Sequence, residues 1–215
     1  MLFNFLNIAL AIRVSDQEQL GLWLTILSVM MWINYFDMGL GAGTRNLFIQ
    51  KNNEINRIKN LIANSYTIMS ILGVALYLIA YILFVFFTNT NSEISIFGSM
   101  NQKDLTKVIF ITMPTFIFIF ILSICRQLFI AIEKNYINEI FNLVASIASA
   151  FFLLNHYFFD RSISWFDMSL IFSLPMLLSL VLLNAYFYLH NAKLIPSFKN
   201  INLEESGGLF DLSIK

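Results

Sequence analysis

Long apolar segments alternate with short polar connections along the 215 residues of the chain. A helix needs about 20 apolar residues to cross the hydrocarbon core of a bilayer, which is about 30 Å thick. Residues 1–12 are apolar but too few, so we interpret them as the remainder of a first helix. Five segments meet the length requirement: residues 19–43, 61–87, 108–131, 137–159 and 166–190. The pattern predicts an all-α, polytopic membrane bundle of about six transmembrane helices within residues 1–190.

Composition places the chain far from soluble proteins. Hydrophobic residues make up 58% of it, charged residues 12%, and the mean hydropathy is +0.73, whereas a soluble domain is about a quarter charged. The 13 basic residues equal the 13 acidic ones in number, so the charge predicts no nucleic-acid partner. The single cysteine, Cys125, cannot form an internal disulfide and does not by itself make a metal site.

Lysine and arginine are distributed unequally between the two sets of alternate connections. Of the 13 basic residues, nine fall on one side of the predicted membrane and four on the other. The first set is Arg45, Lys51, Arg57, Lys59, Arg126, Lys134, Lys193, Lys199 and Lys215, and the second is Arg13, Lys103, Lys107 and Arg161. The positive-inside rule makes the first side cytoplasmic. Both termini are then expected in the cytoplasm, as an even number of helices requires.

The end of the second predicted helix carries an acid, three glycines and an arginine: Asp37, Gly39, Gly41, Gly43 and Arg45. A carboxylate at the centre of a membrane helix costs about 2.5–3.5 kcal/mol and usually marks a functional interior. Asp37 and Arg45 would share one face of a continuous helix but lie about 12 Å apart along it, too far for an ion pair. A break at the glycines would bring them closer. These residues form either the charged mouth of a cavity or an interfacial helix end where Arg45 snorkels to lipid phosphates.

Polar side chains recur at helical spacing inside the other apolar segments. Asn64 lies in the third predicted helix, and Asn138 and Asn142 lie four residues apart in the fifth. Such residues face protein or water, and they serve either helix packing or a lining that contacts substrate. Arg126 lies inside the fourth predicted helix, where it either snorkels to the surface or faces a cavity and attracts phosphate. Pro175 is expected to kink the sixth predicted helix.

Motifs of covalent chemistry are absent from the sequence. It contains no Walker lysine motif, no His-Glu-x-x-His and no Gly-x-Ser-x-Gly. No acidic cluster is placed to hold a metal over a lipid diphosphate. The outer connection over residues 88–106 is too short for a catalytic domain. We therefore expect a protein that is not an enzyme and that uses no cofactor or metal.

Two stretches of the chain resemble a known family, the O-antigen flippases. The N-terminal signature of this family is similar to Gly21-Leu22-Trp23 followed by Trp32-Ile33-x-x-Phe36-Asp37-x-Gly39-Leu40-Gly41-x-Gly43-x-Arg45-Asn46. Its fourth and fifth helices are similar to the stretch around Arg126-Gln127 and Glu133-Lys134-Asn135. The flippases are the polysaccharide-export family of the multidrug/oligosaccharidyl-lipid/polysaccharide exporter superfamily.

The resemblance implies a transporter with two lobes around a central cavity, of which this chain forms the N-terminal lobe. Its cargo would be undecaprenyl-diphosphate-linked oligosaccharide, carried across the bacterial cytoplasmic (inner) membrane for O-antigen or capsular polysaccharide assembly. Arg126 is the candidate cavity cation by position. Residues 191–215 would be a cytoplasmic linker toward a missing second lobe, so a truncated form is expected. The second-helix motif carries over to Asp37, Gly39, Gly41, Arg45 and Asn46.

The resemblance also implies partners: membrane lipids, the lipid-linked oligosaccharide and other membrane proteins of polysaccharide assembly. Two alternatives stay open. One is a multidrug or small-molecule exporter of the same superfamily, whose cavity would be more apolar and aromatic, and the other is a non-transporting membrane scaffold. A glycan-assembly enzyme would need a large outer loop bearing arginine and histidine, and residues 88–106 hold neither.

Overall fold

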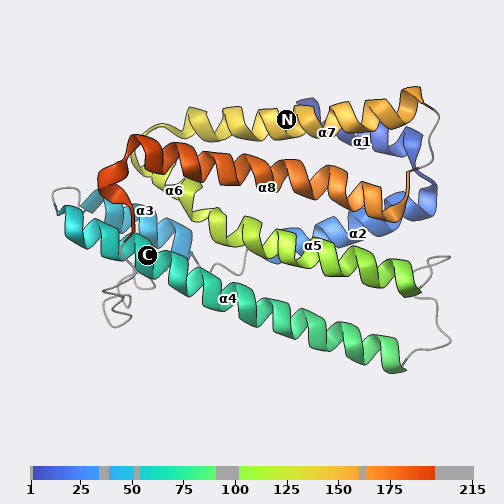
Figure 1. Cartoon of the computed structure of the whole chain (residues 1–215), viewed down its shortest axis with the longest axis horizontal. Helices are drawn as coiled ribbons and strands as arrows, with labels where there is room; N and C mark the ends of the chain where they lie inside the picture. Colours follow the sequence, from blue (N-terminus) through green and yellow to red (C-terminus); the bar gives the residue numbers. More distant parts are fainter. Residues whose placement is uncertain (1, 34–38, 51–53, 91–101, 160–162, 197–215) are drawn as a thin grey trace.

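The computed structural model describes residues 2–33, 39–50, 54–90, 102–159 and 163–196 (Figure 1). Every regular element in these residues is helical, which confirms the predicted all-α class. The elements are α1 (Leu2–Val14), α2 (Gln17–Ile33), α3 (Leu40–Gln50), α4 (Ile55–Thr90), α5 (Gln102–Leu122), α6 (Ile124–Ala131), α7 (Asn135–Phe158), α8 (Trp165–His190) and a short 3₁₀ helix, η2 (Ala192–Leu194).

Four helical stretches among the described residues are long and apolar enough to cross a membrane. They are Ile55–Phe86 in α4, Thr106–Ala131 across α5 and α6, Asn135–Phe158 in α7 and Phe166–His190 in α8. They coincide with four of the five full-length spans expected from the sequence, and they indicate a multi-pass membrane protein. Helices α1 and α2 have 13 and 17 residues, and neither reaches the roughly 20 residues of a span. The described residues therefore hold four candidate spans, where about six were predicted.

The second predicted helix, over residues 19–43, is interrupted. Gly39, between α2 and α3, has φ 77°. A right-handed helix cannot continue through left-handed backbone, which glycine adopts without steric cost. Residues 19–43 are therefore not one continuous helix, and the interruption includes Gly39, one of the three glycines at which a break was considered. The chain resumes as α3 and stays helical to Gln50, beyond the predicted end.

The long helices lie side by side. Figure 1 shows α4, α5, α8 and α7 running lengthwise in this order, with α1 and α2 behind them. The short helices α3 and α6 pack together at one end of the bundle, where α8 also ends, and we call this the α6 end. At the opposite end, α4 and α7 end while α5 and α8 begin. Successive long helices thus run in alternating directions between the two ends, as a membrane bundle requires.

Close packing holds the helices together, because lipid tails are as apolar as the side chains in the interior. At the α6 end the rings of Phe129 and Phe187 are fully buried and meet edge to face, with centroids 5.2 Å apart. Toward the opposite end, Trp23 of α2 packs on Phe172 of α8, with ring centroids 5.4 Å apart. These two ring contacts hold α6 and α2 against α8.

Helix α4 faces outward more than the other spans. Only 11% of its most apolar stretch is buried in the bundle, compared with 50% for the span across α5 and α6. It approaches α5 closely at Gly73, where an added Cβ would lie 3.0 Å from Cγ2 of Ile117. Small residues at such crossings let two membrane helices come close together. Between Ile71 and Phe86, α4 presents apolar side chains to the surroundings, as expected for a helix in contact with lipid.

Candidate functional site

The span across α5 and α6 is broken near the α6 end. The backbone N–H of Arg126 donates to the carbonyl of Ser123, three residues back, at 3.0 Å. The Ser123 hydroxyl donates to the carbonyl of Phe120 at 2.6 Å, and serine bonds of this kind bend helices. The carbonyl of Leu122, which Arg126 would meet in a regular helix, instead accepts Nδ2 of Asn184 at 3.1 Å. A side chain of α8 therefore satisfies the carbonyl that the break leaves free.

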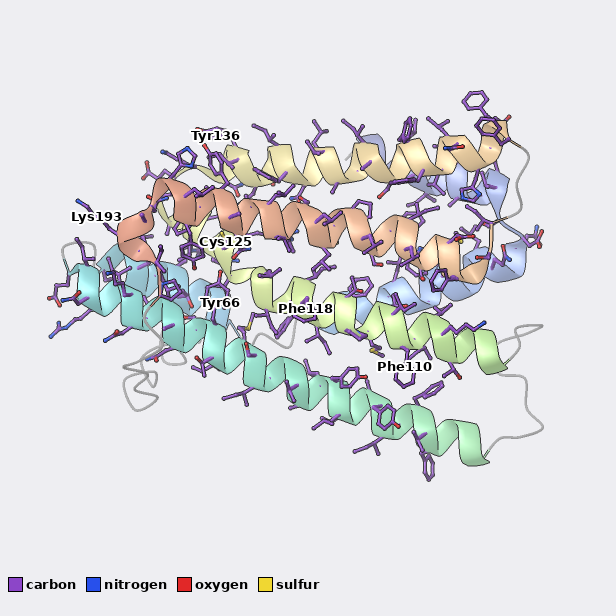
Figure 2. The ribbon with its side chains drawn as sticks, in the orientation of Figure 1. Tyr66, Phe110, Phe118, Cys125, Tyr136 and Lys193 are labelled. Carbon is purple, nitrogen blue, oxygen red and sulfur yellow. The ribbon has the colours of Figure 1, made fainter. Side chains whose placement is uncertain are left out.

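Asn184 connects three helices at this break. Its Nδ2 also donates to the carbonyl of Leu180 in α8 at 2.8 Å, and its Oδ1 accepts the hydroxyl of Tyr66 in α4 at 2.6 Å. Figure 2 shows Tyr66 close to Cys125, the second residue of α6, and far from Phe110 near the opposite end of α5. Three hydrogen bonds hold this amide in one orientation, because each bond is stronger in a low-dielectric interior than in water.

Helix α6 is also held by α7. Nδ2 of Asn138 donates to the backbone carbonyl of Arg126 at 3.1 Å and to Oδ1 of Asn135 at 2.9 Å. The turn between the two helices contains Glu133 in left-handed backbone, with φ 60°. The N–H of Lys134 reaches back to the carbonyl of Phe129 at 2.9 Å, which is the pattern of a Schellman turn at a helix end. Helices α6 and α7 thus form a tight hairpin at the α6 end.

Glu133 in this turn gives a prediction about stability. Left-handed backbone costs a residue with a Cβ about 1–2 kcal/mol, and Glu133 is exposed, with φ 60°. Glu133→Gly is therefore expected to raise the free energy of unfolding in detergent micelles by about 1 kcal/mol. The neighbouring Lys134 has φ −109°, so Lys134→Gly serves as the control and is expected to be neutral or destabilising. The same gain at both positions would contradict the strain at Glu133.

The Arg126 side chain lies inside the α6–α7 hairpin. Its Nη2 donates to Oδ1 of Asn142 at 3.2 Å, and it interacts electrostatically with Glu139 one turn earlier on α7. Its Nε is buried without a hydrogen-bond partner among the described residues, and so are Oε1 of Gln127 and Oδ1 of Asn138. The site therefore combines a cation that has a free donor with amide oxygens that have free acceptors. We call Arg126, Gln127, Asn138 and Asn142 the Arg126 cluster.

The structure brings some of the sequence candidates together and separates others. Arg126, Asn138 and Asn142 meet in the Arg126 cluster. Arg45 and Asn46 are half-buried on α3, and no hydrogen bond among the described residues joins them to Arg126. Asp37 lies outside the described residues. Three further candidates are buried: Asn64 on α4, and Gly41 and Gly43 on α3.

Pro175 lies buried inside α8, which continues through it from Trp165 to His190. A proline has no N–H, so the carbonyl of Ile171 four residues earlier loses its helical partner. Ser149 of α7 donates its hydroxyl to this carbonyl at 2.9 Å. Ser149 of α7 thus serves helix packing, while Asn142 of the same helix contacts Arg126.

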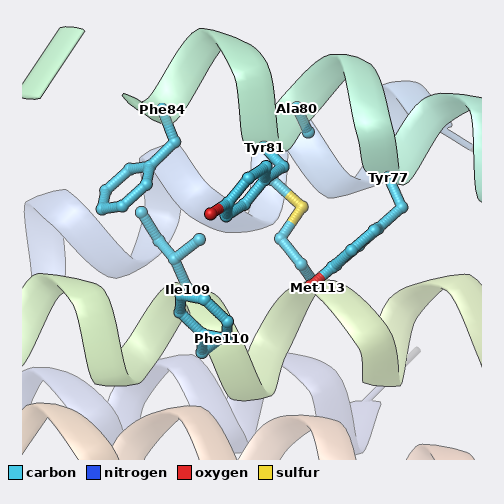
Figure 3. A pocket seen from close by; sticks show the side chains of 7 residues that line it. All are labelled: Tyr77, Ala80, Tyr81, Phe84, Ile109, Phe110 and Met113. Atoms are coloured by element: carbon cyan, nitrogen blue, oxygen red, sulfur yellow. The ribbon is translucent and has the colours of Figure 1, made fainter. Parts of the chain in front are cut away.

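A second feature lies between α4 and α5, nearer the opposite end of the bundle. Figure 3 shows Tyr77, Tyr81 and Phe84 of α4 facing Ile109, Phe110 and Met113 of α5. With Ala80 they line a shallow, open groove between the two helices. The rings of Tyr81 and Phe110 meet edge to face, with centroids 6.2 Å apart. This groove is apolar and aromatic, in contrast to the Arg126 cluster.

The sequence candidates did not include Asn184, Tyr66 or Ser123. For Asn184 the signal in the sequence was an amide inside an apolar segment, since a polar group there needs a partner inside the protein.

No group of three or more His, Cys, Asp or Glu side chains in the described part of the chain could hold a metal ion. No family model, curated protein or solved structure matches the chain.

Proposed function

We propose that this bundle is one lobe of a flippase that moves undecaprenyl-diphosphate-linked oligosaccharide across the bacterial cytoplasmic (inner) membrane. The proposal begins from the resemblance to the O-antigen flippases. The observation that carries it is Arg126, a cation with an unpartnered buried Nε five residues before the end of the span Thr106–Ala131. The cargo would be used in O-antigen or capsular polysaccharide assembly.

The chemistry of Arg126 supports a diphosphate ligand. A charged residue inside a span is costly and is retained where it faces protein, water or a ligand. The planar guanidinium offers several donors in a fork that matches phosphate oxygens. Nη2 is held by Asn142 at 3.2 Å, which leaves Nε available for a ligand.

The amide oxygens beside Arg126 support a sugar-bearing ligand. Oε1 of Gln127 and Oδ1 of Asn138 are buried without partners among the described residues. A buried acceptor without a donor costs about 1–3 kcal/mol, and a sugar hydroxyl can supply the missing donor. The proposed process makes and breaks no covalent bond, so it requires no cofactor.

The proposed orientation places the α6 end, where α8 ends, in the cytoplasm; α1 begins part-way along the bundle (Figure 1), so the cytoplasmic N-terminus stays a prediction from the sequence. At this end, Arg57 and Lys59 lie in the first turns of α4, Lys134 lies in the turn before α7, and Lys193 lies in η2. The positive-inside rule then assigns this end to the cytoplasmic face. Arg126 would meet the diphosphate group of the cargo at the cytoplasmic leaflet. Membrane lipids and other membrane proteins of polysaccharide assembly remain proposed partners.

A second candidate is a multidrug or small-molecule exporter. The aromatic groove between Tyr77, Tyr81 and Phe110 favours it, because an apolar drug needs an apolar and aromatic surface. The groove opens beside α4, the span that is least buried in the bundle. The polar Arg126 cluster lies away from the groove, on α6 and α7, which is why the flippase is preferred. A scaffold without transport would require neither feature.

Measurements of ligand binding distinguish the flippase, the drug exporter and the scaffold. The full chain, purified into lipid nanodiscs, is expected to bind undecaprenyl diphosphate at least about tenfold more tightly than undecaprenol, because charge-assisted bonds to phosphate are each worth about 1.5–3 kcal/mol. Preference for an apolar cationic dye over both lipids would support the drug exporter. Equal weak affinity for all three compounds would support the scaffold.

A further inference from the structure

We propose that Asn184 is a positioning residue for Arg126, acting through the break between α5 and α6. No hydrogen bond among the described residues joins Asn184 to Arg126. It holds the Leu122 carbonyl at 3.1 Å, four residues before Arg126. The inference deepens the proposed function and rests on it, because the orientation of the Arg126 side chain affects binding only if Arg126 binds a ligand.

The first step concerns the backbone. In a regular helix the N–H of Arg126 would bond the carbonyl of Leu122. Here it bonds Ser123 at 3.0 Å, and Leu122 is left without a helical donor. A free carbonyl in a membrane interior is costly. The broken form is therefore favoured over the regular helix only while Asn184 supplies the missing donor.

The second step concerns how the amide is oriented. Nδ2 of Asn184 faces two carbonyls, those of Leu122 and Leu180, while Oδ1 accepts the Tyr66 hydroxyl at 2.6 Å. A carbonyl can only accept, so these neighbours fix which side of the amide carries the nitrogen. Tyr66 thereby holds the donor of Asn184 toward the break. Asn184 is 8% exposed, so water does not compete freely for these bonds.

The third step concerns the direction of α6. Successive helix residues are separated by about 100° around the axis. Restoring the regular bond between Arg126 and Leu122 would change the winding at the break and turn α6 relative to α5. Nη2 of Arg126 would then leave Oδ1 of Asn142, which it now reaches at 3.2 Å. Asn184 thus acts on where the guanidinium points.

The chain contains a natural reporter of this turn. Cys125 is the single cysteine, lies at the start of α6 and is fully buried. Its Sγ lies 3.9 Å from the carbonyl of Leu183, one residue before Asn184. A turn of α6 would move this thiol away from α8 and expose it to a small maleimide. No cysteine has to be added or removed for the measurement.

The experiment uses the full chain in nanodiscs and measures two quantities, the rate of maleimide labelling at Cys125 and the affinity for farnesyl diphosphate. Asn184→Leu is expected to raise the labelling rate and to weaken binding, each by about tenfold. Tyr66→Phe, which removes only a hydroxyl, is expected to change both in the same direction by about threefold. It keeps the test available if the leucine variant does not fold.

The matched control is Ser179→Ala. Ser179 is a buried polar residue of the same helix and bonds a carbonyl of α7, that of Phe141, at 2.8 Å. It has no bond to α6 among the described residues, so its loss should leave labelling and binding unchanged. If Ser179→Ala changes both quantities as much as Asn184→Leu does, Asn184 has only a general structural role and the proposal is overturned.

A double-variant test separates positioning from stability. In an Arg126→Gln background, Asn184→Leu should cause no further loss of farnesyl diphosphate binding, while labelling of Cys125 still rises. A further tenfold loss in that background would show that Asn184 acts without Arg126, and would overturn the proposal. Failure of the unaltered chain to bind farnesyl diphosphate would contradict the proposed function. In that case unchanged labelling in Asn184→Leu would overturn the present inference as well.

Discussion

Arg126→Leu is expected to reduce the export of lipid-linked oligosaccharide by at least about tenfold, because each charge-assisted hydrogen bond to phosphate is worth about 1.5–3 kcal/mol. Arg126 lies in the Arg126 cluster with Nη2 on Asn142 and Nε without a partner. Leucine fills the space with apolar volume and removes every donor. The measurement is the amount of oligosaccharide-lipid retained in the inner leaflet of a strain that carries only the variant gene.

Two further variants serve as a comparison and a control for Arg126→Leu. Arg126→Lys keeps the charge but not the planar fork, so an intermediate loss is expected. Arg57 lies at the same end of the bundle but forms an exposed ion pair with Glu54 at 2.8 Å, and such pairs contribute little. Arg57→Leu should therefore leave export unchanged. If Arg126→Leu exports at the normal level at equal protein abundance, Arg126 does not bind the cargo.

Ser149→Ala is expected to lower the free energy of unfolding by about 1–3 kcal/mol, because it leaves a buried carbonyl unpaired. The carbonyl is that of Ile171, which Pro175 deprives of its helical donor and which Ser149 reaches at 2.9 Å. In a Pro175→Ala background the N–H of residue 175 can supply the bond. The cost of Ser149→Ala should then fall well below its value in the unaltered chain.

The control for this cycle is again Ser179→Ala. Ser179 donates to Phe141 of α7 at 2.8 Å, a carbonyl that no proline deprives of its donor. Its loss should cost about 0.5–1.5 kcal/mol with either residue at position 175. Unfolding in detergent micelles gives all the required free energies. If Ser149→Ala costs the same in both backgrounds, the bond to Ile171 does not compensate for Pro175.

The all-α class and four candidate spans could be predicted from the sequence because length and apolarity decide them. The three glycines within residues 19–43 favoured a break there, but its position at Gly39 was missed, since the apolar pattern runs on while Gly39 leaves the right-handed region. The break at Ser123 was also missed. Neither glycine nor proline marks it, and what stabilises it is a side chain 61 residues later, Asn184 bonded to Leu122 at 3.1 Å.

The candidate site, too, could be predicted only in part from the sequence. Arg126, Asn138 and Asn142 could be selected from the sequence because polar residues inside apolar segments are few, and the spacing of the two asparagines places them on one face of α7. Their meeting with Arg126 depends on the α6–α7 hairpin, whose turn contains Glu133 at φ 60°. A left-handed glutamate has no signal in the sequence. Contacts between helices, such as Tyr66 with Asn184, require knowledge of which helices are neighbours.

The central claim is that the protein moves a lipid-linked glycan, and the leaflet in which that lipid accumulates tests it most directly. In a strain that lacks the gene, oligosaccharide-linked undecaprenyl diphosphate should accumulate in the inner leaflet and stay protected from a glycan-modifying enzyme added to the outer face. A two-lobed version of the protein should relieve the accumulation, and the same version with Arg126→Leu should not. A normal distribution of the lipid between the two leaflets in the deleted strain would contradict the flippase account.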